Sequence, residues 1–132
     1  MLKLDLRFES QVQAVETAVN FAARRVLKRI GYLIAQDAKQ SIKTSAMPSR
    51  PGTPPNTRGG GRKSLRASIF YDATDEDVVI GPRFSFVGDS AQAHEFGVSR
   101  FGEDFDERPF MGPALGRNTS RFADEWQGSI GQ

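Results

Sequence analysis

Hydrophobic and polar residues alternate strictly at the start of the chain, over residues 2–8. A period of two turns one face toward a core and the other toward water, which predicts an antiparallel edge strand. Ser10 follows, with Gln13 three residues later. In a capping box at this spacing, the serine bonds an amide of the first turn and the glutamine side chain reaches back. The pattern therefore predicts a strand followed directly by the start of a helix.

A long helix is predicted over residues 11–43, which hold no proline and a single glycine, Gly31. Aliphatic residues recur there at spacings of three, four and seven, which places them on one helical stripe. These residues are Val12, Val15, Val19, Val26, Ile30 and Leu33. At about 1.5 Å per residue the helix would be roughly 50 Å long, more than a domain of this size needs for its own core. The surplus length could project or serve a neighbouring subunit.

Two aromatic residues lie on another side of this helix. Phe21 and Tyr32 are eleven positions apart, on nearly the same side and away from the aliphatic stripe, with Arg25 between them. Aromatic side chains on a face that would otherwise be wet indicate a contact surface, which makes these three residues a candidate oligomer face. The alternative, equally supported, is that a loop or the C-terminal helix covers them.

Residues 44–64 interrupt the pattern. The stretch holds four of the seven prolines and the run Gly59-Gly60-Gly61, so it predicts a long flexible loop. Its charged residues are Arg50, Arg58, Arg62 and Lys63, with no acidic residue among them. Loops of this length in a compact domain are usually functional or disordered. The four basic side chains could contact phosphate or an acidic partner, or could simply keep a solvated loop soluble.

A small antiparallel sheet is predicted after the loop. Residues 65–71 and 78–80 flank the acidic turn 72–77 as in a β-hairpin, and residues 83–87 alternate like a third strand. An acidic loop is expected over residues 98–108.

A last helix should begin near Gly112-Pro113, because proline suits the first helical position. Leu115, Phe122 and Trp126 would then share one face and dock this helix on the sheet.

The predicted fold class is α+β, in a single domain over residues 1–132. A long N-terminal helix would pack on a small antiparallel β-sheet, with a short C-terminal helix and a long Pro/Gly-rich basic loop.

Composition narrows the class of protein. The chain has 132 residues, of which 38% are hydrophobic, with one histidine and no cysteine. One core without disulfides or thiolate metal sites is therefore expected. No apolar run approaches the roughly 18 residues that a membrane span needs, and the N-terminus lacks the apolar core of a signal peptide. We expect a soluble protein that is made inside the cell and has no membrane partner.

The net charge of +2 conceals two unlike halves. Residues 1–64 hold 12 Lys and Arg against 4 Asp and Glu, whereas residues 65–132 hold 6 against 12. Such a split lets copies of the chain attract one another head to tail, or holds one face toward a polyanion. The alternative is that the two halves interleave in the fold and cancel locally.

Candidate chemistry is sparse. His94, the only histidine, is followed by Glu95, but Val98 stands where a zincin helix needs its second histidine. The glycine run differs from a phosphate-binding loop because Arg62 separates it from Lys63 and no strand precedes it. We expect His94 to be a polar residue at a strand or turn edge. We also expect no catalytic site, no cofactor and no metal site.

Three short segments, taken in order, carry a resemblance. They are Thr57-Arg58-Gly59 leading to Lys63-Ser64-Leu65-Arg66-Ala67-Ser68-Ile69, then His94-Glu95-Phe96-Gly97, and finally Arg108-Pro109-Phe110-Met111-Gly112-Pro113-Ala114-Leu115. Their order and spacing resemble those of the tail-completion or head–tail joining (neck, minor tail) proteins of long-tailed double-stranded DNA phages and prophages. This chain departs from the family pattern in a longer basic loop over residues 57–64 and in a longer, more acidic segment between Gly97 and Pro109.

The resemblance implies a structural protein and not an enzyme. Copies would form a ring, expected to be a hexamer, at the junction between the capsid connector and the tail. The ring would lie in the virion after assembly in the bacterial host cytoplasm. It would contact connector and tail proteins, and its basic loop could reach DNA in the lumen. The alternative is a small basic nucleic-acid-binding module that contacts phosphates through the loop.

The motif segments also suggest structural roles for single residues. Pro109 and Pro113 would fix the path of the chain into the last helix, and Phe110 would anchor that corner in the core. Gly97 would allow a tight turn after Phe96.

Overall fold

The computed structural model describes residues 2–59, 61, 64–100 and 103–127, and it describes residues 2–21 and Arg100 by their backbone alone. Its elements are α1 (Leu2–Ser41), the 3-10 helix η1 (Arg66–Ser68), β1 (Ile69–Ala73), β2 (Val78–Pro82), α2 (Phe84–Val87), α3 (Ser90–Phe96), β3 (Val98–Arg100), β4 (Glu103–Phe105) and α4 (Met111–Trp126). β1 pairs with β2 and β3 with β4, both antiparallel, in two separate sheets. The fold class is α+β, as the sequence predicts.

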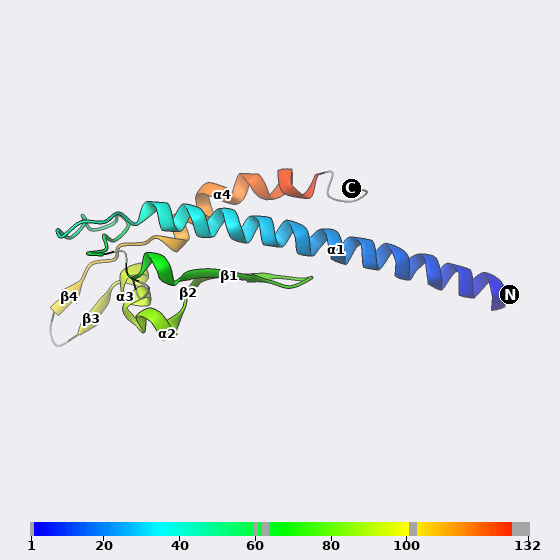
Figure 1. Cartoon of the computed structure of the whole chain (residues 1–132), viewed down its shortest axis with the longest axis horizontal. Helices are drawn as coiled ribbons and strands as arrows, with labels where there is room; N and C mark the ends of the chain where they lie inside the picture. Colours follow the sequence, from blue (N-terminus) through cyan, green and yellow to red (C-terminus); the bar gives the residue numbers. More distant parts are fainter. Residues whose placement is uncertain (1, 60, 62–63, 101–102, 128–132) are drawn as a thin grey trace.

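α1 is a single helix of 40 residues that runs along most of the length of the molecule (Figure 1). The predicted edge strand over residues 2–8 and the capping box at Ser10 and Gln13 are therefore wrong. No proline or glycine separates residues 2–8 from the helix that follows, and Leu, Lys and Arg are good helix formers. Extending an existing helix is also easier than starting a new element. Among the described residues, no helix has the length and apolar character needed to cross a membrane.

Two layers pack against the C-terminal half of α1, with α4 on one side and the β1–β2 hairpin on the other (Figure 1). The core between them is small and consists mostly of aliphatic side chains. It contains Val26, Ile30, Ile34, Ala35, Ala38 and Ile42 of α1, together with Ile69, Ala91, Phe110 and Ala114. The predicted stripe is confirmed at Val26 and Ile30, while the side chains of Val12, Val15 and Val19 lie outside those described.

The β1–β2 hairpin confirms the predicted antiparallel pair, in the register Ile69↔Pro82 to Ala73↔Val78. The first strand begins four residues later than expected because Arg66–Ser68 form a 3-10 turn. Gly31 of α1 faces this hairpin. A Cβ atom at Gly31 would lie 2.8 Å from Cδ2 of Tyr71 and 2.9 Å from Cγ2 of Val78. The single glycine of the helix thus allows the hairpin to approach closely.

α4 begins at Met111, close to the predicted start, but it docks on α1 and not on the sheet. Its buried positions are Ala114 and Asn118, which are one turn apart. These smaller residues let the two helices come together, whereas Leu115 stays 49% exposed. The prediction that Leu115, Phe122 and Trp126 dock the helix on the sheet is therefore wrong.

Two further expectations need correction. The predicted third strand over residues 83–87 is the short helix α2, and the Phe86 ring packs edge-on against Phe70 at 5.7 Å between centroids. A run of five alternating residues also fits one helical turn, so the pattern alone does not decide between them. The acidic stretch 98–108 is not a plain loop, because it contains the antiparallel strands β3 and β4.

Candidate functional site

An open groove of about 820 Å³ lies along α1 between β2 and α4. Leu27, Ile30 and Ile34 of α1, Val78, Ile80 and Pro82 of β2, and Leu115, Phe122 and Trp126 of α4 contribute to it, with Phe84, Ala91, Phe96, Phe110 and Met111 from the neighbouring segments. Its polar lining residues are Asp89, Gln92 and Glu95. The lining is therefore largely apolar, with few groups that could orient a small polar ligand.

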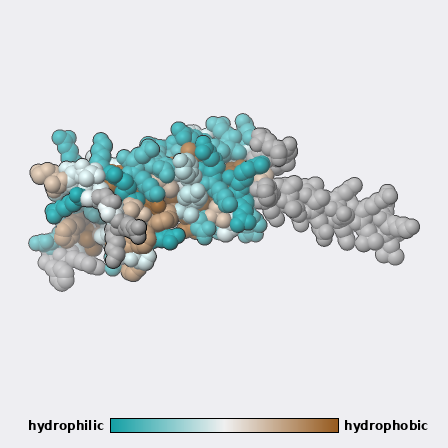
Figure 2. Space-filling view, in the orientation of Figure 1, coloured by the Kyte–Doolittle hydropathy of each residue, from teal (hydrophilic) through white to brown (hydrophobic). Residues whose placement is uncertain are grey.

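Large apolar side chains line this groove and remain exposed to solvent. Phe84 and Phe96 are 71% and 73% exposed, and Trp126 is 42% exposed. Figure 2 shows hydrophobic residues at the surface of the body, on the lower side where the hairpin and the short helices lie. A contiguous apolar surface of this kind is typical of a protein–protein contact.

The groove is framed at one end by a corner that joins α3 to α4. Oε2 of Glu95 accepts hydrogen bonds from the backbone N–H groups of Phe110 and Met111, at 2.9 and 3.0 Å. Oε1 of Glu95 accepts one from the N–H of Gly112, at 2.8 Å. The first amides of a helix have no partner within the helix and carry partial positive charge. The Glu95 carboxylate satisfies three of them.

The same corner contains the other residues expected to be structural. Gly97 has φ +72°, and a Cβ there would lie 2.9 Å from the carbonyl oxygen of Phe105, so the tight turn after Phe96 requires glycine. Phe110 is only 1% exposed, which confirms it as a core anchor. Pro109 and Pro113 are half-buried on either side of the helix start, where proline is tolerated.

The described part of the loop 44–64 is hydrogen-bonded to the body. Nε of Arg108 donates to the carbonyl oxygen of Ser49 at 3.0 Å, and the N–H of Gly52 donates to the carbonyl oxygen of Glu107 at 2.9 Å. The side chain of Arg66 donates to the carbonyl oxygen of Ile42, just beyond the end of α1. The loop thus lies beside the segment that leads into α4.

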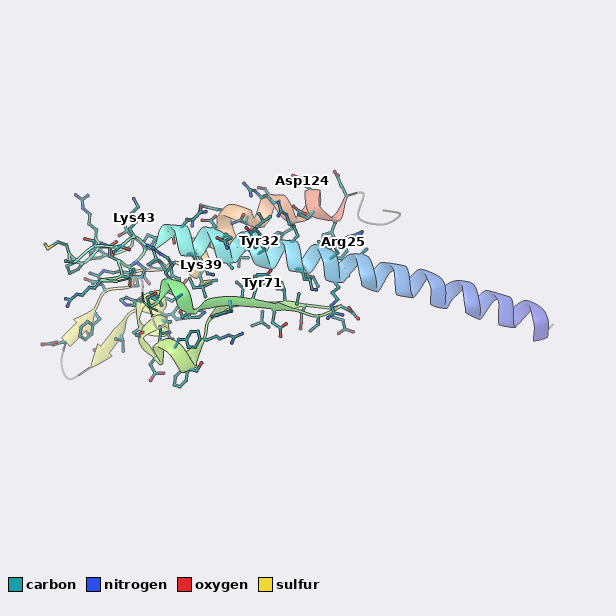
Figure 3. All side chains as sticks on the ribbon, in the orientation of Figure 1. Arg25, Tyr32, Lys39, Lys43, Tyr71 and Asp124 are labelled. Carbon is teal, nitrogen blue, oxygen red and sulfur yellow. The ribbon has the colours of Figure 1, made fainter. Side chains whose placement is uncertain are left out.

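The candidate basic residues are only partly placed. Arg50 and Arg58 are exposed, whereas Arg62 and Lys63 lie outside the described residues. Lys43, which the sequence analysis did not select, is also exposed, just beyond the C-terminal end of α1 (Figure 3). The acidic β3–β4 hairpin lies at this same end of the molecule (Figure 1). Basic and acidic segments from the two halves of the sequence are therefore neighbours here.

The candidate oligomer face on α1 is also only partly described. Tyr32 is 43% exposed, and the guanidinium of Arg29 lies 5.9 Å from the centre of its ring. Arg25 is exposed further along the helix (Figure 3), and the side chain of Phe21 lies outside those described. α4 reaches this side of the helix, since Glu125 and Arg29 form an ion pair at 3.7 Å. Even so, the Tyr32 side chain stays partly open to solvent.

His94 lies within α3, so the expectation of a strand or turn edge is wrong. Burial lowers the pKa of its imidazole, and the positive charge of Arg108 lowers it further. The carbonyl oxygen of His94 accepts a hydrogen bond from the N–H of Arg108. Within the described ranges, no three His, Asp or Glu side chains lie together as a metal site would require.

A polar cluster missed by the sequence analysis holds α4 against α1. Arg117 forms an ion pair with Asp37, 2.6 Å between Nη2 and Oδ1, and Nδ2 of Asn118 donates to Oδ2 of Asp37 at 2.8 Å. The hydrogen bond from Arg117 is the largest cause of the lowered pKa of Asp37. These residues are about eighty positions apart, and nothing in the local pattern links them.

The three segments singled out by resemblance meet in one part of the fold. Ile69 of the first and Phe110 of the third belong to the same buried core, and Glu95 of the second binds the backbone of the third. No protein-family model, curated protein or solved structure matches this chain.

Proposed function

We propose that this chain is a structural subunit of a phage head–tail junction, whose copies form a ring between the capsid connector and the tail. The observation that carries the proposal is the meeting of the three family-like segments around Glu95 and Phe110. Three unrelated turns could each resemble a family by chance. Segments that also come together around one buried core support a shared architecture more strongly.

The surface of the molecule suits an assembly subunit. Its groove is open and apolar, and Phe84 and Phe96 are mostly exposed along it. Burying such side chains against another protein is favourable, by about 25 cal/mol per Å² of apolar area removed from water. The groove therefore favours a protein partner over a small polar metabolite.

The end of the molecule that carries the basic loop would contact the neighbouring components. Arg50 and Arg58 are exposed there, and so are the acidic residues Glu103 and Asp104 of β4, whose hairpin lies at the same end of the molecule (Figure 1). A surface with both signs of charge suits a connector or tail protein of complementary pattern. In the assembled ring, the basic side chains would also be available to DNA in the lumen, in a virion assembled in the host cytoplasm.

A gene disruption tests this proposal. A stop codon early in the gene, in the phage or prophage that encodes it, should leave filled heads and free tails that do not join, as seen by electron microscopy. Supplying the intact gene in trans should restore infectious particles. Normal yields of joined, infectious virions from the disrupted phage would refute the proposal.

The alternative, a basic nucleic-acid-binding module, rests on the exposed side chains of Lys43, Arg50 and Arg58. It requires the isolated chain to bind DNA with an affinity that falls steeply with salt, and an R50A/R58A variant to flatten that dependence. Such binding, combined with normal virions from the disrupted phage, would favour this alternative.

A further inference from the structure

α1 is longer than the body that packs on it. The ion pair between Glu125 and Arg29 places the last turn of α4 beside the middle of α1, and the hairpin reaches Gly31 through Val78. Figure 1 shows the ribbon of α1 continuing beyond the hairpin tip and beyond the end of α4. We define the overhang as residues 2–20, the part of α1 that precedes Ala22, its first buried residue among those with described side chains. At about 1.5 Å per residue, it is nearly 30 Å long.

The overhang has the sequence pattern of a buried helix. Its apolar residues Leu4, Phe8, Val12, Val15 and Val19 follow one another at spacings of four, four, three and four. This spacing places them on a single stripe of a helix. The same stripe continues in Ala22, Val26 and Ile30, which are buried in the body of the chain's own fold.

The groove has the form that an amphipathic helix needs. Its floor is α1, its walls are β2 and α4, and its largely apolar lining contains exposed side chains such as Leu115. A helix laid along this groove would lie over α1 with β2 and α4 on either side, and packed helices lie about 8–10 Å apart. Recognition of an amphipathic helix by an apolar groove is a recurring mode of protein association.

We propose that the overhang of one copy packs into the groove of a second copy. α1 is one continuous helix from Leu2 to Ser41, so the overhang cannot turn back into the groove of its own chain. Every copy nevertheless carries one overhang and one groove. A contact between two different surfaces generates a ring when the rotation between copies closes. This inference names the contact that would build the proposed ring, and it rests on the proposed function for the closure of that ring.

Two single substitutions test the contact from its two sides. F8D places a charge on the apolar stripe of the overhang, and L115D places one at the partly exposed wall of the groove. T17D, on the opposite side of α1, and S120D, on the opposite side of α4, are the matched controls. Circular dichroism and thermal unfolding would establish that all four variants fold.

Analytical ultracentrifugation of these chains provides the readout. The unaltered chain, T17D and S120D should form oligomers, whereas F8D and L115D should each weaken association at least about tenfold, because each would bury an unpaired charge. An equal mixture of F8D and L115D should stop at dimers, since only one intact overhang and one intact groove remain in each pair.

The inference would be overturned by an unaltered chain that stays monomeric at every concentration. Oligomers of F8D or L115D as stable as the controls, or a mixture that forms no dimer, would also overturn it. Loss of binding to a tail protein by L115D, with self-association intact, would assign the groove to that protein and would also overturn it. Normal virions from the disrupted phage would refute the phage role alone, and rings of F8D that still support joining would refute this contact alone.

Discussion

The carboxylate of Glu95 accepts a hydrogen bond from the backbone N–H of Phe110, 2.9 Å away. This bond links the end of α3 to the start of α4. The same carboxylate also binds the amides of Met111 and Gly112. The β3–β4 hairpin lies between these two anchor points in the chain. One side chain therefore holds the end of the groove together.

Removing this carboxylate should destabilise the protein. We expect E95A to lower the free energy of unfolding by about 1–3 kcal/mol, because it leaves three amides at the start of α4 without their partner. E95Q should lose less stability, since its amide oxygen can still accept a hydrogen bond from these amides. Urea unfolding measures both, with E103A at an exposed position of β4 as the control. Equal stabilities for E95A and E103A would contradict this account of the corner.

Replacing Gly31 or Gly116 with alanine should change the stability of the protein in opposite directions. G31A would place a methyl group 2.8 Å from the Tyr71 ring, so we expect a loss of about 1–3 kcal/mol. G116A meets open space in the middle of α4, so we expect a gain of about 0.5–1 kcal/mol from helix propensity. Thermal unfolding of the two variants gives the comparison. A neutral G31A would mean that the hairpin lies further from α1.

His94 should make the protein less stable in mild acid. Its pKa in the folded state is lowered from 6.5 by burial and by Arg108. The unfolded chain then takes up the proton first, so stability falls as the pH drops through 6.5 toward the lower folded pKa. Unfolding free energies at about pH 8 and pH 5 should differ less in H94Q than in the unaltered chain. The same difference in both proteins would exclude this role for the imidazole.

Asp37 should affect the stability of the fold at a lower pH than His94 does. The hydrogen bond from Arg117 holds the pKa of Asp37 below its ordinary value of 3.8. Its stabilising effect is therefore fully present above pH 3.8 and is lost as the pH falls through the folded pKa.

D37N should be less stable at neutral pH, by no more than about 1 kcal/mol because the pair is partly exposed, and should lose less on acidification. D75N, in the exposed turn of the hairpin, is the control for the change of charge. Urea titrations at neutral pH and near pH 3 would show the difference. Parallel pH profiles for D37N and the unaltered chain would argue against the ion pair.

The elements that depend on local pattern were predictable from the sequence. The long helix, the β1–β2 hairpin and the start of α4 are set by nearby residues, such as the proline-free run before Ser41 and the acidic turn at 74–77. Residues 2–8 and 83–87 were misassigned because a short alternating run fits a strand and a helical turn equally well. Residues 2–8 are helical because they continue directly into the rest of α1, whereas residues 84–87 form a separate short helix that ends at Gly88.

The groove and its corner depend on contacts between distant parts of the sequence. Glu95 lies fifteen residues before Phe110, and Asp37 lies eighty before Arg117. The periodicity of hydrophobic residues predicts one helix or strand at a time. It therefore does not predict which elements pack together to form the walls of a groove. The resemblance did single out Glu95 and Phe110, but only the fold shows that the first binds the backbone of the second.

We propose above that this protein acts through its contact surfaces, as one subunit of a ring at the head–tail junction. Native mass spectrometry of the purified chain, alone and mixed with candidate phage connector and tail-tube proteins encoded beside it, tests this most directly. The account predicts one closed assembly of several copies that binds at least one of these partners. A chain that remains monomeric in every mixture, and binds neither partner, would contradict it.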